Sequence, residues 1–348
     1  MSLRIAIVVG ARPQFIKYGP VYQALKAKDV EQLLIHTGQH YDKTMSDMFF
    51  EQLELPQPDY NLGICDSSHS DMTGRMMIKL EEIFLAEKID GVLVFGDTNS
   101  TLAASLVVAK IDGLDLIHVE AGLRSYNRKM PEEINRVITD HVSNLLFCPT
   151  GVSVSNLEKE GLVDGVHLVG DVMHDATLGN VSKAPPLKSI FKQLDFKEEN
   201  YVLATVHRAE NTDDPRRLAE ILDYIDEQAE APVLMPLHPR TKKRIQEFGV
   251  KLGDIHAADP VGYLEMITLL KNAKGIYTDS GGMQKEAYFL RTPCVTLRDE
   301  TEWVETVACG WNRLYTVPEY QERTEITEYG TGNAAGKMTD ILCQYFRE

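Results

Sequence analysis

The sequence predicts an α/β protein built from two doubly wound domains. Short apolar runs rich in β-branched residues alternate with segments of helical spacing, a pattern typical of parallel βαβ units. The alternation is interrupted once, by a polar segment at residues 182–200, and then resumes. A chain of 348 residues is also about twice a common domain size, which favours two domains.

The predicted strands end in polar or glycine-rich residues. In the first half they lie at residues 4–10, 32–38, 91–98, 115–122, 145–150 and 166–171. Helical spacing between them occupies residues 19–28, 71–88 and 100–110. In the second half, strands are expected within 201–208, 231–239, 275–282 and 292–299, and helices at 215–228 and 262–273.

The polar segment 182–200, which contains Pro185 and Pro186, is interpreted as a connecting segment. We place the domain boundary near residue 175, so that the first domain covers residues 1–174. Open α/β sheets bind ligands beyond the carboxyl ends of their strands, so two facing sheets predict a ligand in an interdomain cleft. Functional residues should therefore follow strand ends.

Composition limits the classes of partner. Lys and Arg number 36 against 52 Asp and Glu, a net charge of −16, which disfavours nonspecific binding to nucleic acid or to an anionic membrane surface. The five cysteines form no CxxC pair, so we expect reduced thiols rather than disulfides or a thiolate metal site. No apolar stretch approaches the roughly 18 residues of a membrane helix, and we expect a cytoplasmic protein.

Cofactor signatures are absent from the sequence. The first strand is not followed by GxGxxG, and no GxxxxGK[ST] occurs, so neither a dinucleotide nor a P-loop is expected. No cluster of histidines and carboxylates has the spacing of metal ligands. We therefore expect a protein that uses no cofactor and no metal.

The turn IYTDSGGMQKEA, residues 276–287, is the most informative segment of the second half. Ser280 is expected to cap a helix, and Gly281 and Gly282 allow the backbone to approach a phosphate at the positive end of the helix dipole. An ordinary capped turn is the alternative. Glu286 either accepts hydrogen bonds from a ribose diol or is a solvated helix glutamate.

Acidic residues follow the strands of the first half. Asp97 and Glu120 each follow a strand, and Glu132 and Glu133 begin a helix after Pro131. Repulsion among converging carboxylates and partial burial raise a carboxyl pKa toward neutrality, which suits proton transfer. The alternatives are structural: Asp97 caps a helix, and the two glutamates favour a helix N-terminus.

Histidines end two strands of the second half. His207 is followed by Arg208, and His238 lies two residues before Arg240. A strand-end histidine that points into a cleft is well placed to bind phosphate or to carry a proton. Because some of the ten histidines must be structural, we rank His207 above His238 as a functional residue.

Taken together, these motifs resemble those of the non-hydrolysing UDP-N-acetylglucosamine 2-epimerase family. They run from residue 10 to about residue 337 and include GARPQFIK, HTGQHYD, GDTNSTLAASL, HVEAGLRS, MPEEINR, HRAEN, DSGGMQKEA and YGTGNAAGK. The resemblance implies two Rossmann-like domains in a glycosyltransferase-B-type architecture. It implies a second domain at 175–333, a final helix within 334–348 that returns to the first domain, a UDP-sugar as partner and a homodimer.

The family reaction inverts C2 of a UDP-linked 2-acetamido sugar. C2 loses a proton, UDP leaves C1 to give a 2-acetamidoglycal, and UDP adds back after protonation on the other face. Because the C2 hydrogen is not next to a carbonyl, its removal is coupled to departure of the stabilised UDP anion. Products of this reaction serve cell-surface polysaccharide synthesis.

The resemblance also implies roles for particular residues. Asp97, Glu120 and Glu132 would share the acid, base and 3-hydroxyl roles, and His207 would stabilise the leaving diphosphate. The residues expected to bind the UDP-sugar are Arg12, Lys17, Arg136, His238, Met266, Ser280, Gly281, Gly282 and Glu286. Among them, Arg12 and Lys17 are assigned to the diphosphate, and Met266 to the uracil.

Departures from the common bacterial pattern leave the sugar open. GARPQFIK, HRAEN and ETEWVE stand where GTRPEAIK, HRRE and TTERPE are usual. These variants are more similar to archaeal members, or to the branch that acts on UDP-2,3-diacetamido-2,3-dideoxyglucuronate for the O-antigen of lipopolysaccharide. Gln14, Phe15, Trp303 and Val304 would then accommodate the bulkier, charged sugar. Asp42 stands where activated members carry a cationic effector site, so no activation by a second UDP-sugar is expected.

Three rival functions share part of this pattern. A glycosyltransferase of the same architecture needs an acceptor groove and one base, and leaves three acids unexplained. A hydrolysing epimerase releases the free sugar. A non-catalytic nucleotide-sugar sensor needs Arg12 and Ser280 but not the acids.

Overall fold

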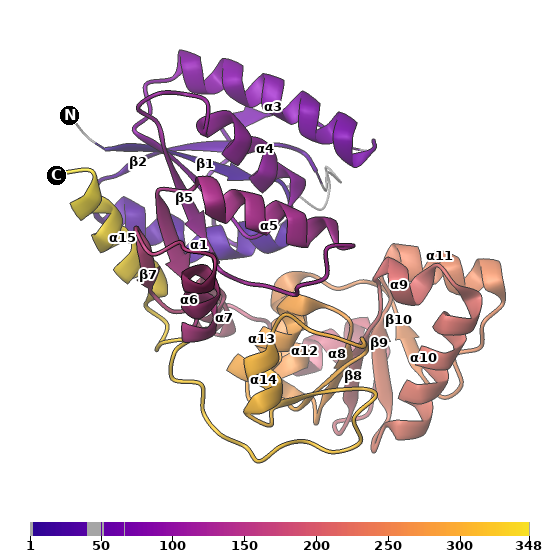
Figure 1. Cartoon of the computed structure of the whole chain (residues 1–348). Coiled ribbons are helices and arrows are strands. Elements are labelled where there is room, and N and C mark those ends of the chain that lie inside the picture. The colour runs from indigo at the N-terminus through magenta and orange to yellow at the C-terminus, as the bar shows by residue number, and fades with distance from the viewer. Residues whose placement is uncertain (1–2, 40–49, 51, 66, 348) are drawn as a thin grey trace. The chain divides into compact units, whose positions relative to one another are not determined.

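The computed structural model describes residues 3–39, 50, 52–65 and 67–347, and the chain divides into two compact units (Figure 1). Unit 1 comprises Met1–Ala176 and Thr327–Glu348, and unit 2 comprises Thr177–Ile326. The motif residues 40–42, including Asp42, lie outside the described residues. No helix in the described part of the chain is long and apolar enough to cross a membrane.

Unit 1 is built around a parallel sheet whose described strands have the order β3-β2-β1-β4-β5-β6-β7. The strands are β1 Arg4–Val9, β2 Glu31–His36, β3 Tyr60–Asn61, β4 Gly91–Phe95, β5 Asp115–Val119, β6 Leu145–Cys148 and β7 Val166–Leu168. The order reverses between β1 and β4, so the sheet is doubly wound and has a switch point there.

The helices of unit 1 cover this sheet. They are α1 Arg12–Ala27, α3 His69–Ala86, α4 Asn99–Val108, α5 Pro131–Val142, α6 Gly151–Lys159 and α15 Ala334–Tyr345, while α7 Val172–Val181 crosses the boundary to unit 2. Figure 1 shows α3, α4 and α5 grouped together, and α1 beside α15, in agreement with their contacts. Both faces of the central strands are therefore buried, which explains why their sequences are continuously apolar.

Helix α15 is attached to unit 1 through its first turn. The carboxylate of Asp175, on α7, accepts hydrogen bonds from the backbone amides of Ala334 (3.0 Å) and Ala335 (2.8 Å). The segment 327–333, which we assigned to the second domain, belongs to unit 1. Its Tyr329 is buried, and the Tyr329 carbonyl accepts from the amide of Asp171 at 3.1 Å.

Unit 2 repeats the same design. Its described strands have the order β10-β9-β8-β11-β12-β13, which reverses between β8 and β11. They are β8 Val202–Thr205, β9 Val233–Pro236, β10 His256–Ala258, β11 Ile276–Thr278, β12 Cys294–Thr296 and β13 Asn312–Leu314. Its helices are α8 Leu187–Gln193, α9 Ala209–Thr212, α10 Pro215–Gln228, α11 Pro239–Phe248, α12 Tyr263–Asn272, α13 Gly281–Phe289 and α14 Val304–Ala308.

The interpretation of residues 182–200 as a connecting segment is wrong. Helix α8 lies within it, and its Phe191 packs with Phe196 and Tyr201 in the core of unit 2, with ring centroids 5.2 to 5.8 Å apart. Pro186 does not interrupt structure here, because it occupies the N-cap position of α8. The lysines between these apolar residues are exposed, so the polar composition reflects one face of a short helix.

Helix α1 also differs from its prediction, since it begins at Arg12 instead of residue 19. Gln14 occupies the third helical position, and its Oε1 accepts from the amides of Gly10 (2.8 Å) and Ala11 (3.1 Å). Pro13 lies in the first turn, where a missing N–H group has no cost. This capping places the start of α1 directly at the switch point.

Candidate active site

The predicted site residues follow the strands at the two switch points. In unit 1, Arg12 follows β1 and Asp97 follows β4. In unit 2, His207 follows β8 and Ser280 follows β11. Ligands of open α/β sheets bind at such switch points. The predicted residues therefore occupy the place in each sheet where a ligand site is expected.

Gln14 fixes the switch point of unit 1. Its Nε2 donates to the carbonyl of Phe95 (2.8 Å) and to the Thr98 hydroxyl (3.0 Å), so the start of α1 is tied to the turn after β4. Gln14 and Phe15 are both buried, and Phe15 stacks on His36 with ring centroids 5.0 Å apart. Both side chains therefore pack inside unit 1, contrary to their expected role in accommodating the sugar.

Asp97 is held by a cation on α5. Arg136 donates its Nε to Asp97 Oδ2 at 3.2 Å and also donates its Nη2 there. Thr98, not Asp97, caps α4, because the Thr98 hydroxyl accepts from the amide of Thr101 at 3.3 Å. The alternative that Asp97 is a helix cap is therefore wrong.

Glu133 is a structural residue of α5. Its carboxylate accepts from the amides of Ser125 (2.9 Å) and Tyr126 (2.8 Å), and from Arg136 Nη1 (2.9 Å). Burial raises the pKa of this carboxyl, but these donors outweigh burial and hold the pKa below its usual value. Glu132, one residue earlier, is exposed in the first turn of α5, where a negative charge is favoured.

Glu120 combines burial with a strained backbone. Its φ is 73°, in the left-handed region that residues other than glycine rarely adopt, and it is 8% exposed. Lys17 of α1 forms an ion pair with its carboxylate. The ammonium of Lys17 is thus directed at an acid of the same unit, whereas we expected it to contact a diphosphate.

Each of these strand-end acids is paired with a cation. Among the described residues, Asp97 is paired with Arg136 and Glu120 with Lys17. The arrangement holds two carboxylates in defined positions at the ends of the adjacent strands β4 and β5.

In unit 2, Ser280 caps α13 as predicted. Its hydroxyl accepts from the amide of Met283 at 3.5 Å, and Gly281 is the first residue of the helix. A Cβ on Gly281 would lie 2.5 Å from Glu302 Oε1, so a larger residue would have to displace this carboxylate. Arg298 holds Glu302 through an ion pair of 2.8 Å.

A buried aspartate that the sequence did not single out orients His207. Asp279 accepts from the amides of His207 (3.0 Å) and Arg208 (2.9 Å), and lies 3.1 Å from His207 Nδ1. Burial raises the pKa of this carboxyl, but the hydrogen bond and charge of His207 and the two amides outweigh burial and keep it low. Nδ1 of His207 is thereby the donor to Asp279. Asp279 is adjacent to Ser280 after β11, so the strand-end pattern could have identified it.

His238 lies beside His207, with ring centroids 5.6 Å apart. It is the N-cap of α11, and its Nδ1 accepts from the amide of Arg240 at 3.2 Å. Nε2 of His238 therefore carries the proton when this ring is neutral. The structure thus brings the two strand-end histidines together with the turn of Ser280.

Three further residues have defined places in unit 2. Glu286 is 5% exposed within α13, so its reading as a solvated glutamate is wrong. Met266 lies in the first turns of α12 and packs partly against the core. Trp303 is buried, with the ammonium of Lys285 3.9 Å from the centroid of its ring, so it packs inside the unit.

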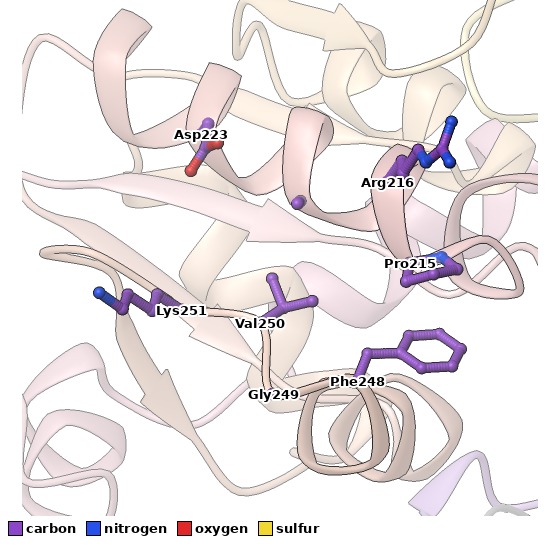
Figure 2. Close-up of a pocket in the computed structure, with 8 residues that line it drawn as sticks. Pro215, Arg216, Asp223, Phe248, Gly249, Val250 and Lys251 are labelled. Atoms are coloured by element: carbon purple, nitrogen blue, oxygen red, sulfur yellow. The ribbon is translucent and has the colours of Figure 1, made fainter.

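A pocket elsewhere in unit 2 does not include these residues. Figure 2 shows it between α10 and the segment that follows α11, with Arg216, Phe248 and Lys251 among its lining residues. Its lining contains none of the predicted site residues. No group of three or more His, Cys, Asp and Glu side chains in the described ranges could hold a metal ion.

Two doubly wound sheets of this type, with acids at one switch point and a capped glycine turn at the other, define a glycosyltransferase-B-like protein. The chain belongs to the UDP-N-acetylglucosamine 2-epimerase family, whose model matches residues 23–343. The predicted family and fold class are confirmed, and the members of this family are isomerases.

Curated relatives cover nearly the whole chain. A UDP-N-acetylglucosamine 2-epimerase homolog of Methanococcus maripaludis is 48% identical and covers 98% of this chain and 99% of its own length. A UDP-2,3-diacetamido-2,3-dideoxy-D-glucuronate 2-epimerase of Pseudomonas aeruginosa is 46% identical, covering 98% of this chain and all of its own. The crystal structure of a Methanocaldococcus jannaschii UDP-GlcNAc 2-epimerase, in complex with UDP-GlcNAc and UDP, superposes with a TM-score of 0.87 at 41% identity, covering 99% of this chain and 100% of that chain.

Proposed function

We propose that the chain is a non-hydrolysing UDP-sugar 2-epimerase that inverts C2 of UDP-N-acetylglucosamine. The observation that carries this proposal is the pair of acids held by cations at the β4 and β5 strand ends, Asp97 with Arg136 and Glu120 with Lys17. A protein that only binds a nucleotide sugar does not need them. The bound UDP-GlcNAc and UDP in the archaeal relative support the same substrate class.

In this proposal, unit 1 handles the proton at C2. A carboxylate accepts the C2 proton while the C1–O bond to UDP breaks, leaving a 2-acetamidoglycal and the UDP anion. An acid on the opposite face then returns a proton to C2, and UDP adds back to C1. Lys17 and Arg136 hold the carboxylates of Glu120 and Asp97 in place, and exposed Glu132 completes the set.

Unit 2, together with Arg12, holds the UDP. The amides at the start of α13 and the positive end of its dipole favour a diphosphate, and Gly281 lets the phosphate oxygens approach. His207 is oriented by Asp279 through Nδ1, which leaves Nε2 to donate to the departing diphosphate. Glu286 and Met266 are assigned to the ribose and the uracil.

The uronate is the second candidate substrate. The Pseudomonas relative named for it is 46% identical to this chain, and the UDP-N-acetylglucosamine 2-epimerase of Methanocaldococcus jannaschii is also 46% identical. Overall identity therefore does not separate the two sugars. The homodimer and the cytoplasmic location stay predictions, as does a binding site in a cleft between the two domains.

The test is to incubate the protein with each UDP-sugar in D2O and follow the products by NMR. We expect deuterium at C2 of the epimerised product and a trace of free UDP, with UDP-N-acetylglucosamine turned over. A product with protium retained at C2 contradicts the elimination mechanism. A kcat/KM at least about tenfold higher for the uronate, or about 1.4 kcal/mol, assigns that sugar instead. Transfer to an acceptor, or release of free sugar, identifies a glycosyltransferase or a hydrolysing enzyme.

A further inference from the structure

A buried ionic network lies directly behind the two strand-end acids. His118, on β5, places Nδ1 2.7 Å from Asp140 Oδ1 and Nε2 2.8 Å from the carbonyl oxygen of Gly96. The other carboxylate oxygen of Asp140 accepts from the amide of Gly122 (3.1 Å) and from Arg124 Nη1 (2.6 Å). His118 and Asp140 are completely buried.

The contacts of His118 fix the orientation of its ring. The two ring nitrogens face the carboxylate of Asp140 and the carbonyl of Gly96, so the ring bridges α5 and the turn after β4. Arg124 pairs in turn with both oxygens of Glu160 at 2.7 Å, which extends the network to the end of α6.

The network acts on the backbone that carries the acids. Gly96 precedes Asp97, and Gly122 lies two residues after Glu120. Gly96, Glu120 and Gly122 all have left-handed backbones, with φ of 59°, 73° and 77°. Such conformations persist where the surroundings hold them. Asp140 lies on α5, the helix that also supplies Glu132 and Arg136, and contacts the turn after β5 directly at Gly122 and the turn after β4 through His118.

We propose that His118 and Asp140 are positioning residues, which fix the carboxylates of Asp97 and Glu120 relative to each other and to α5. The inference rests on the proposed function, because it assumes that these acids act on the substrate. Displacement of a reacting group by about 1 Å can lower a rate about 100-fold. The pair should therefore affect kcat, with little effect on substrate affinity.

The test compares two variants of His118. In His118→Gln the side-chain amide takes the place of Nε2 and can still donate to Gly96. In His118→Asn the amide takes the place of Nδ1, so it keeps Asp140 and loses Gly96. We expect kcat for epimerisation to fall about 100-fold or more in His118→Asn and less than about tenfold in His118→Gln, with KM within about threefold of wild type in both.

Leu116→Ala is the matched control. Leu116 is buried in the same strand, and its truncation destabilises unit 1 through a cavity without touching the network. It should lower the unfolding midpoint and leave kcat unchanged. The proposal is overturned if kcat falls equally in both His118 variants, or if the variants change mainly KM. It is also overturned if Leu116→Ala lowers kcat as much as they do.

A second variant serves as the test if His118→Asn fails to fold. If His118→Asn does not unfold cooperatively, Asp140→Asn replaces it. One carboxylate oxygen then becomes an NH2 group, which cannot accept a hydrogen bond from His118 or from Gly122 and Arg124. A loss of kcat of about tenfold or more with KM kept supports the proposal, and a smaller loss overturns it. If the wild type does not epimerise the substrate, the proposed function is contradicted. If the wild type does but the variants keep their kcat, only the positioning role is contradicted.

Discussion

The two switch points share a topology and differ in their chemistry. In unit 1, the strands β4 and β5 end in carboxylates that are paired with cations, and Glu120 has a left-handed backbone. In unit 2, β11 ends in a capped turn whose amides and histidines favour an anion. In the proposed function, one topology serves proton transfer in one unit and anion binding in the other, and the side chains after the strands decide which.

The difference also lies in what surrounds each site. The acids of unit 1 depend on residues far away in the sequence, such as Lys17, which is 103 residues from Glu120. The anion-binding elements of unit 2 are largely contiguous, from Asp279 to Gly282, and depend on local capping. We therefore expect substitutions in unit 1 to act on kcat, and those in the unit 2 turn to act on UDP affinity.

The largest expected effect is that of Glu132→Gln. Glu132 is exposed, so its replacement should change the free energy of unfolding by no more than about 0.5 kcal/mol. Loss of a proton-transfer group should lower kcat by about 100- to 10,000-fold. Kinetics, thermal unfolding and UDP titration measure the three quantities. Glu82→Gln, on the exposed face of α3, is the control and should have wild-type kcat. If Glu132→Gln keeps its kcat but binds UDP more weakly, Glu132 is a binding residue and not a proton-transfer group.

Gly281→Ala tests the anion-binding turn. The new Cβ would lie 2.5 Å from Glu302 Oε1, so either this carboxylate, which is paired with Arg298, or the start of α13 must shift, and we expect UDP binding to weaken by about 1 to 3 kcal/mol. The chemical step at saturating substrate should change less. Calorimetric titration with UDP measures the effect. Gly74→Ala, at a helical position with open space, is the matched control and should bind UDP as the wild type does. Unchanged UDP affinity in Gly281→Ala contradicts a phosphate site at this turn.

The smallest expected effect is a pH dependence that separates the stabilities of the two units. Burial lowers the pKa of His36, in β2, to about 4. The unfolded chain then binds more protons between pH 6.5 and 4, so unit 1 should lose about 1 to 2 kcal/mol between pH 7 and pH 5. The low pKa of Asp279 in unit 2 acts in the same direction but at lower pH: its stabilisation is complete above the pKa of the unfolded chain and is lost as the pH falls below that value.

Two probes can follow this difference. Both tryptophans, Trp303 and Trp311, belong to unit 2, so their fluorescence follows that unit while circular dichroism follows both. From pH 7 to pH 5, the midpoint from circular dichroism should fall more than that from fluorescence. His36→Phe, which keeps the stacking on Phe15, should remove most of the gap. An equal shift of both probes, or a gap that His36→Phe retains, contradicts this assignment.

The sequence predicted most of the elements and the places where the site residues lie. Strand-end positions follow from local pattern and parallel topology, which is why Asp97, Glu120, His207 and Ser280 were found. Helix α8 was missed because seven helical residues after two prolines give too short a pattern to detect.

The partners of the site residues could not be predicted in the same way. The ion pair of Lys17 with Glu120 and the network of His118 with Asp140 depend on which helix packs over which strand end. Glu133 illustrates the limit. It looked equivalent to Glu132 in sequence, but Glu132 is exposed, whereas the carboxylate of Glu133 is buried and accepts from four donors.

The attachment of α15 has a consequence for the order in which the chain folds. Unit 1 is discontinuous, because its last helix is made after the whole of unit 2. During synthesis, residues 177–326 are complete while the first sheet still lacks the helix that contacts α1, and the carboxylate of Asp175 lacks the amides it later accepts from. The nascent chain therefore completes the residues of unit 2 before α15 can dock on α1 and complete unit 1.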